Sequence, residues 1–256
     1  MRIPSLLCAG LLLSGCATLN APPEEHDPYE QFNRSVYRFN DALDRNLLKP
    51  VAEVYDNVVP DFVSTGVSNF FSNLDDVLVL INDVLQAKPQ QALSDFSRIV
   101  WNTTVGLFGL IDVATPMDLP KHNEDFGQTL GYWGVSPGPY LVLPFLGPST
   151  VRDGSGTALS WYVDPLAEAS PDYTTYWSAV AVNAVDTRAD LLGTTGLIEQ
   201  AALDPYVFTR EAYLQHRRNL VFDGKPPPPE FDIFDEEFDE GLDEAPPDEE
   251  AAPETP

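Results

Sequence analysis

The sequence predicts a mainly α-helical protein, and two observations support this. Apolar residues recur every three or four positions through most of residues 27–222, which is the spacing of one helix face. Several expected helix starts also pair a capping side chain with a proline at the first helical position. These pairs are Asp27-Pro28, Asp164-Pro165, Ser170-Pro171 and Asp204-Pro205. We find no strand-like alternation of apolar and polar residues, so no strand is predicted.

The first two helices are expected to be amphipathic and aromatic. The first runs from about Pro28 to Leu48 with one apolar face, and Pro50 is expected to end it. The second begins at Pro60 and continues to Leu85. Its stripe is aromatic and its charges are few, which suits a bilayer interface, although a core helix has the same pattern.

Three further helices are expected along the chain. One starts at Pro89 and continues to Ile111, with two internal glycines that cost about 1 kcal/mol each relative to alanine. The next spans Asp172 to Leu192 and carries Arg188 on its apolar stripe, where the guanidinium either snorkels or pairs with an acid, or lines a polar passage. The last runs from Asp204 to about Leu220.

The stretch from Phe126 to Gly156 is rich in glycine, proline and aromatic residues. Its apolar centre, Tyr140–Leu146, is interrupted by Pro144 and is far shorter than the roughly 20 residues of a spanning helix. Pro144 also argues against a central strand. Two interpretations remain: a re-entrant segment held among helices, or a buried core loop.

The N-terminus reads as a bacterial lipoprotein signal. Arg2 and an apolar run precede Leu13-Ser14-Gly15-Cys16, so we expect residues 1–15 to be removed and Cys16 to be acylated. Two or more acyl chains anchor a protein stably, whereas one holds it marginally. A plain secretory signal is the alternative. Residues 16–26 are then a lipidated linker, and the mature chain has no thiol pair.

The C-terminus, residues 223–256, is predicted to be a disordered acidic tail. Pro226–Pro229 forms a stiff spacer, and 13 acidic residues but no basic ones follow Lys225. Phe231, Phe234 and Phe238 nevertheless fall at helical spacing. They either dock on a basic partner or belong to a solvated tail.

The composition excludes several function classes. The formal net charge is −26, and no basic patch is available for nucleic acid. The three histidines lack metal-ligand spacing, Ser155 lacks a nucleophile-elbow motif, and no phosphate loop or dinucleotide fingerprint is found. We therefore expect no enzyme activity, metal or cofactor.

Several ordered blocks together resemble the MlaA (VacJ) family of outer-membrane lipoproteins. The resemblance covers about residues 13–222. The blocks are DPYEQFNR at 27–34, GVSNF at 66–70, NTTVG at 102–106, DVA at 112–114, EDFGQTLG at 124–131, GPY at 138–140, PS at 148–149, RD at 152–153, DPY at 204–206 and REAY at 210–213.

This resemblance implies a ring of amphipathic helices embedded in or at the membrane, around a channel that moves phospholipids out of the outer leaflet. It implies two protein partners, a trimeric outer-membrane porin and a soluble periplasmic lipid-binding protein. It also implies anchoring from the periplasmic side in the outer membrane of a Gram-negative bacterium. The candidate channel or gate residues are Asn69, Phe70, Tyr140, Pro144, Gly147, Arg152, Asp153 and Arg188.

Two other classes stay open. One is a non-channel envelope scaffold lipoprotein with a water-soluble helical core, and the other is a lipid-acting enzyme. The channel class requires apolar helix faces that contact lipid, whereas the scaffold class requires that those faces be buried.

Overall fold

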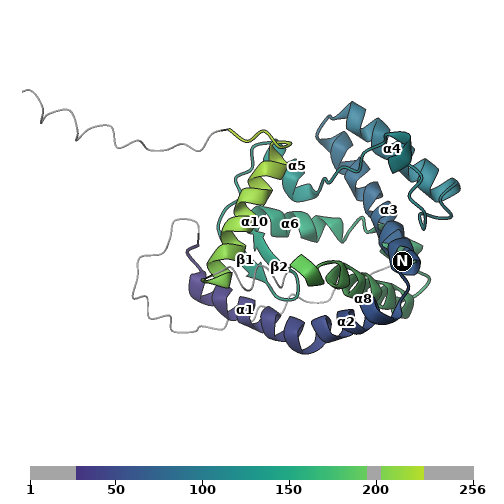
Figure 1. The fold of residues 1–256 in the computed structure, drawn as a ribbon. Helices are drawn as coiled ribbons and strands as arrows, with labels where there is room; N and C mark the ends of the chain where they lie inside the picture. Colours follow the sequence, from purple (N-terminus) through teal and green to yellow (C-terminus); the bar gives the residue numbers. More distant parts are fainter. Residues whose placement is uncertain (1–26, 195–202, 228–256) are drawn as a thin grey trace, which may run out of the picture.

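The structure is a computed structural model that describes residues 27–194 and 203–227, and helices dominate it (Figure 1). Its elements in chain order are α1 (Glu30–Leu43), a π-helical turn (Asp44–Leu48), α2 (Lys49–Val58), α3 (Asp61–Leu85), α4 (Pro89–Thr104), a 3-10 turn (Thr115–Met117), α5 (Phe126–Tyr132), β1 (Tyr140–Leu143), β2 (Gly147–Thr150), α6 (Val151–Ser160), α7 (Pro165–Ala169), α8 (Tyr173–Asp190) and α10 (Pro205–Val221).

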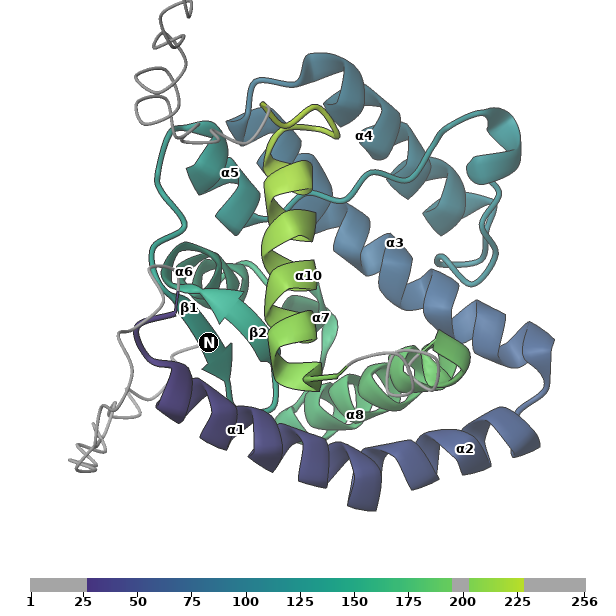
Figure 2. The same cartoon turned by 60° about the vertical axis from the view of Figure 1, so that its left-hand side comes forward.

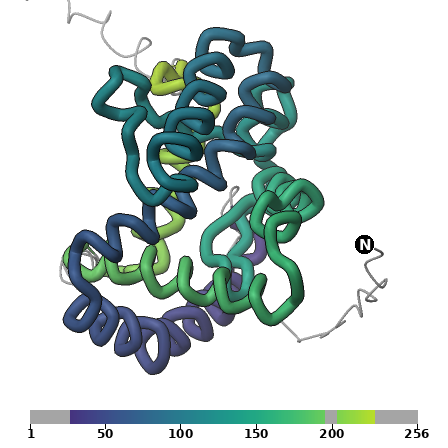
Figure 3. The backbone as a smooth tube through the Cα atoms, turned by 90° about the vertical axis from the view of Figure 1, so that its right-hand side faces the viewer, coloured from purple at the N-terminus to yellow at the C-terminus, as the bar shows by residue number. Residues whose placement is uncertain are grey.

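The helices follow one another around a closed circuit, so the expected ring-like arrangement is confirmed. α1 and α2 lie end to end along one side, and α2 contacts α8, which contacts α3 (Figure 2). α3 packs against α4 and α5, α5 packs against α6, and the hairpin of β1 and β2 returns to α1. From the side, the α3–α4 end and the α1–α2 end lie at opposite ends of the molecule (Figure 3).

The prediction that Pro50 ends the first helix is wrong. The helix continues into α2 through the π-helical turn, where the Lys49 backbone N–H donates to the Asp44 carbonyl. A proline inside an α-helix removes one hydrogen bond and clashes with the carbonyl four residues earlier. A π turn directly before the proline changes that register, and the helix passes Pro50 without ending.

The predicted long helix from Pro89 to Ile111 is also wrong at its C-terminal end. α4 stops at Thr104, and the chain then turns through left-handed backbone at Leu107, Phe108 and Gly109, with φ of 53°, 59° and 89°. A Cβ atom on Gly109 would lie 2.6 Å from the Asn73 Cβ atom. The glycine therefore lets a tight loop pack directly against α3.

The stretch Phe126–Gly156 contains two strands that the sequence analysis did not predict. β1 and β2 form an antiparallel hairpin in which Tyr140 is paired with Thr150 and Leu143 with Gly147. Pro144 lies in the turn, in keeping with its exclusion from the strands. Four-residue strands are too short to show an alternating pattern, which explains the miss.

The proline pairs mark only some of the helix starts. The side chains of Asp164 and Asp204 cap α7 and α10 as predicted. The predictions for Asp27 and Ser170 are wrong, because α8 is capped by Asp172 and the α1 N-terminus has no side-chain cap. Asp27 is instead fully buried.

Candidate functional site

The interior of the molecule is mainly polar, and its surface carries many large apolar side chains. Within residues 27–194 and 203–227, only six hydrophobic residues are buried, against 20 polar or charged ones. Over the same residues, 38 large hydrophobic side chains are exposed. Proteins that fold in water bury apolar residues and rarely bury unpaired charges, so this distribution is reversed.

The exposed apolar side chains belong to elements all around the circuit. In α1, Phe32 and Phe39 are 57% and 48% exposed, so much of the predicted apolar stripe faces outward. Among the most exposed aromatic side chains are Tyr162 after α6, Phe62 at the start of α3, Phe108 in the loop after α4 and Phe145 in the hairpin turn. Within the part of the chain that the structure describes, no helix is both long enough and apolar enough to cross a bilayer.

The free edge of β1 is covered by two asparagines of α1. The Asn33 amide donates to the Tyr140 carbonyl at 3.0 Å and accepts from the Val142 N–H at 2.9 Å. Asn40, two turns later, donates to the Leu143 carbonyl and accepts from the Phe145 N–H at 3.0 and 2.9 Å. Unpaired backbone groups are costly in an apolar surrounding, and these amides satisfy them without a third strand.

A buried acid ties the start of the described chain to its last helix. Asp27 accepts from Asn33 at 2.8 Å and pairs with Arg210 of α10 at 3.3 Å. Its second oxygen also accepts a short hydrogen bond from the Tyr206 hydroxyl. Asp27 and Arg210 are 0% and 4% exposed, so this ion pair is inside the molecule.

The predicted pair Arg152 and Asp153 lies in an ion-pair network between α6, α5 and α10. Asp153 contacts Arg152 at 2.9 Å and Arg217 at 3.0 Å, and it accepts from the Tyr213 hydroxyl at 2.9 Å. Two guanidinium nitrogens of Arg217 also donate to the two carboxylate oxygens of Asp125. Burial alone would raise the pKa of Asp153, but the two guanidiniums and the Tyr213 hydroxyl outweigh it and hold that pKa below its usual range.

Beside this network is a cavity of about 960 Å³, which is within the size range of ligand pockets. Its walls are the start of α6 and one face of α10. The lining mixes arginines with apolar side chains: Pro137, Thr150, Arg152, Asp153, Val207, Arg210, Glu211, Leu214, Gln215, Arg217, Arg218, Val221, Phe222 and Pro227.

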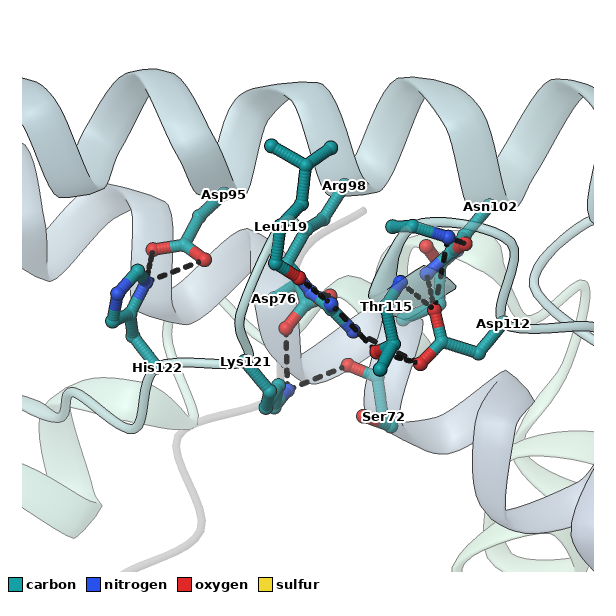
Figure 4. Close-up of polar contacts among 12 residues, drawn as sticks. Ser72, Asp76, Asp95, Arg98, Asn102, Asp112, Thr115, Leu119, Lys121 and His122 are labelled. Carbon is teal, nitrogen blue, oxygen red and sulfur yellow. Dashed lines mark hydrogen bonds and ion pairs between the residues drawn. The ribbon is translucent and has the colours of Figure 1, made fainter. Parts of the chain in front are cut away.

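A second buried network joins α3 and α4 to residues 112–122 (Figure 4). Arg98 contacts Asp76 and Asp112 at 3.4 Å each and donates to the Thr115 hydroxyl at 3.1 Å. Asp76 also pairs closely with Lys121. Asn102 of α4 donates to Asp112 and accepts from two backbone N–H groups. A segment without regular structure is thus fixed by charged and amide side chains.

Two buried carboxyls lie next to each other near the α3–α4 turn. Asp83 and Asp95 are both 0% exposed, and Asp95 contacts the His122 ring at 2.9 Å. Among the described residues no N–H or O–H group donates to either carboxyl oxygen of Asp83, and a protonated Asp83 can itself donate to Asp95. Burial and the neighbouring Asp95 raise the pKa of Asp83 to about 8.

Arg188 is paired with an acid, as one of its two predicted alternatives requires. Its Nε and Nη2 atoms donate to the two carboxylate oxygens of Asp44 in the π-helical turn, at 2.7 and 2.9 Å, and the residue is 8% exposed. Two residues earlier, Asp186 accepts from the Tyr55 and Ser68 hydroxyls, both at 2.7 Å. The polar side of α8 thereby joins the π turn, α2 and α3.

The structure does not bring the candidate channel residues into one cluster. Asn69 donates to the Leu110 carbonyl at 3.2 Å, and Phe70 of α3 packs edge-on against Phe71. Tyr140 is buried beneath α10, whereas Pro144 lies in the hairpin turn and Gly147 begins β2. Arg152 and Asp153 begin α6, and Arg188 lies on α8. Cys16, Phe231, Phe234 and Phe238 lie outside the described residues.

Sequence reasoning missed several buried and half-buried polar residues that organise the interior. Asn33, Asn40, Arg98 and Arg217 were not singled out, although Asn33 and Asn40 are spaced seven apart on one helix. Polar side chains at that spacing, beside the apolar stripe of the same helix, were the available signal. Among the described residues, no group of His, Cys, Asp and Glu is arranged to hold a metal ion.

Comparison with known proteins decides the family. A family model described as "MlaA lipoprotein" matches residues 25–220. The chain belongs to the MlaA lipoprotein family.

Two relatives that carry the family name align with most of the chain. The "Intermembrane phospholipid transport system lipoprotein MlaA" of Escherichia coli strain K12 is 38% identical over 237 residues, which is 88% of this chain and 90% of that protein. The protein of the same name from Haemophilus influenzae is 37% identical over 234 residues, or 87% and 91% of the two chains.

A solved structure shares the fold. It comes from work described as "Structural basis for maintenance of bacterial outer membrane lipid asymmetry". Its chain is 36% identical in sequence, with a TM-score of 0.68 over 76% of this chain and 98% of its own.

Proposed function

We propose that this MlaA-family chain is an outer-membrane lipoprotein that forms a channel for phospholipids. The channel takes phospholipids out of the outer leaflet and hands them to a soluble periplasmic carrier. The observation that supports this most directly is the reversed polarity of the fold, with 20 buried polar residues and 38 exposed large apolar ones in the described part. The names of the relatives place them in phospholipid transport.

Such a circuit suits a hydrocarbon environment although none of its described helices can span one. Backbone groups within hydrocarbon must be paired inside the protein. The hairpin meets that demand through Asn33 and Asn40, and the loop at 112–122 meets it through Arg98 and Asn102. We therefore propose that the apolar faces of α1, α2 and α3, with the hairpin turn, contact lipid.

A polar passage enclosed by apolar helices lowers the cost of moving a phospholipid. Releasing two acyl chains of about 16 carbons into water costs roughly 25 kcal/mol at about 0.8 kcal/mol per CH₂. Carrying a charged phosphate through about 30 Å of hydrocarbon is costly as well. In the proposed channel the head group follows the polar interior while the acyl chains stay in lipid.

The remaining parts of the proposal concern attachment and partners. Cys16 carries the acyl anchor on the periplasmic side, a trimeric porin holds the ring in the outer membrane, and the soluble carrier receives the lipid. We propose Arg152 and Asp153, which line the cavity beside α10, for the exit. Asn69, Phe70, Tyr140, Pro144, Gly147 and Arg188 remain proposed channel or gate residues. No catalytic step is part of the proposal.

The experiment measures phospholipid in the outer leaflet of cells whose own copy is replaced by variants. Deletion of the chain should raise outer-leaflet phospholipid, and Arg152→Ala with Asp153→Ala should reproduce part of that rise at normal protein levels. Arg38→Ala, an exposed change on α1, is the control. If the double variant leaves lipid asymmetry unchanged, the proposed exit is wrong; if deletion does so, the transport function is wrong.

A further inference from the structure

We propose that the cavity between α6 and α10 is the docking site for the acidic tail of the same chain, residues 231–242. This inference does not depend on lipid transport. It starts from where the described chain ends, because Pro227 itself lines the cavity. The Arg218 guanidinium donates to the Pro227 carbonyl at 2.8 Å, so the tail leaves from within the cavity wall.

The apolar part of the cavity has the form of a groove along one helix. Val207, Leu214 and Val221 line it from α10, and their spacing of seven residues places them on one face of the helix. All three are half-buried, so each still presents apolar surface. At about 1.5 Å per residue this row is about 21 Å long.

The tail carries a matching row. Phe231, Phe234, Phe238 and Leu242 are separated by three, four and four residues, and as a helix they would form an apolar stripe about 16 Å long. Amphipathic helices bind apolar grooves through such i, i+3 and i+7 anchors. Phe231 follows Pro227 by four residues, so at about 3.1 Å per residue for an extended proline-rich chain the first anchor could reach no more than about 12 Å from Pro227.

The cavity lining has a positive balance, four arginines against Asp153 and Glu211, which favours an acidic segment as the occupant. Four of the 14 basic residues in the chain line this one cavity, namely Arg152, Arg210, Arg217 and Arg218. Arg152, Arg210 and Arg217 have carboxylate partners within the fold, and Arg218 is at the exposed end near Pro227. Residues 228–256 carry 13 acids and no base. Arginine side chains bind carboxylates with charge-assisted hydrogen bonds.

The test places one thiol in the tail and one on α10 of the full-length protein. Asp239→Cys is combined either with Gln215→Cys, which lines the cavity, or with His216→Cys, its exposed neighbour that does not. Docking raises the effective concentration of the tail at the cavity, so the pair at 215 should form its intramolecular disulfide roughly tenfold faster than the pair at 216. Equal rates would overturn the proposal.

Charge and apolar changes then test the two halves of the contact. Arg218→Glu should make the disulfide between positions 239 and 215 form no faster than the one between 239 and 216. Arg38→Glu, the same charge reversal on α1, should leave the difference between the two rates intact. Phe234→Ser with Phe238→Ser should abolish the same rate difference without changing the tail charge. If the disulfide at position 215 still forms faster in both the Arg218 variant and the double phenylalanine variant, the proposal is contradicted. So would disulfide formation that begins only after bound phospholipid is removed, because a lipid would then be the occupant of the cavity.

Discussion

At the scale of single residues, buried ions are fixed by several partners each. Arg98 illustrates this, with a side chain 3% exposed that contacts Asp76, Asp112, the Thr115 hydroxyl and the Leu119 carbonyl. A buried ion pair adds little net stability relative to an apolar pair, but removal of one partner leaves a charge without compensation. Such networks therefore specify one arrangement of α3, α4 and residues 112–122.

We expect Arg98→Leu to lower the free energy of unfolding by about 3 kcal/mol, since the Leu119 carbonyl and two carboxylates lose their donor. Chemical denaturation in mild detergent measures the change. Asp41→Asn is the control, because it removes only an exposed i,i+4 pair with Arg45, worth less than about 1 kcal/mol. A loss for Arg98→Leu no larger than that of the control would show that the buried network is not stabilising the fold.

Asp83 should make stability depend on pH in an unusual direction. Its pKa is raised to about 8 by burial and by Asp95, so between about pH 4 and pH 8 the folded state holds a proton that the unfolded state has released. Stability from this group is present at low pH and falls as the pH rises through that window.

Asp83→Asn should therefore stabilise the protein at pH 8 and have little effect at pH 4. Thermal unfolding at the two pH values tests this, with Asp75→Asn on the exposed side of the same helix as the control. A change that is the same at both pH values would mean that Asp83 is not protonated in the folded protein.

At the scale of elements, the hairpin depends on a helix more than 100 residues earlier. Asn33 of α1 holds the Tyr140 carbonyl, the Val142 N–H and Asp27. Asn33→Leu removes the side-chain partner of the buried Tyr140 carbonyl and Val142 N–H, at about 1–3 kcal/mol each, and takes one donor from Asp27, so we expect a loss of at least about 2 kcal/mol. Denaturation measures the loss, and hydrogen exchange at Val142 should accelerate.

Asn46→Leu is the matched control for that change. Asn46 is exposed in the π-helical turn and donates to the Ala42 carbonyl of its own helix. A surface substitution of this kind usually changes stability by less than about 0.5 kcal/mol. If both variants lose the same amount, the asparagine contacts do not hold the hairpin.

The difference between local and long-range contacts explains which elements could be predicted from sequence. The spacing of apolar residues is local, and it predicted α3 and α10 nearly to the residue, from Asp61 to Leu85 and from Pro205 to Val221. The hairpin depends on Asn33 and Asn40, whose contacts are 103 to 109 residues away in sequence. No local pattern carries that information, so β1 and β2 were missed.

The helix ends predicted around Pro50 and Gly109 were wrong for a related reason. A proline usually ends a helix, but the π turn before Pro50 contains Asp44, which pairs with Arg188 of α8. Gly109 was taken as an internal helix residue, whereas its positive φ and its contact with Asn73 of α3 require a loop. In both cases tertiary contacts decided between two local conformations.

At the scale of the whole molecule, the sequence predicted the apolar stripes but not the direction in which they face. Phe32 and Phe39 are exposed, and Asn33 from the same helix is buried. A stripe has the same period whether it faces a core or a lipid, so periodicity alone cannot separate the two. The candidate site was likewise predicted only through Arg152 and Asp153, because its other members are brought together by the fold.

The exposed apolar surface gives the most direct test of the account. We expect the Cys16→Ala protein, which would lack the proposed acyl anchor, to remain monodisperse only in detergent and to co-purify with phospholipid, because we propose that its exposed apolar side chains contact lipid. Size-exclusion chromatography with light scattering, followed by lipid analysis of the peak, measures both. A compact, lipid-free monomer in plain buffer would contradict the account and favour the scaffold lipoprotein with a water-soluble core.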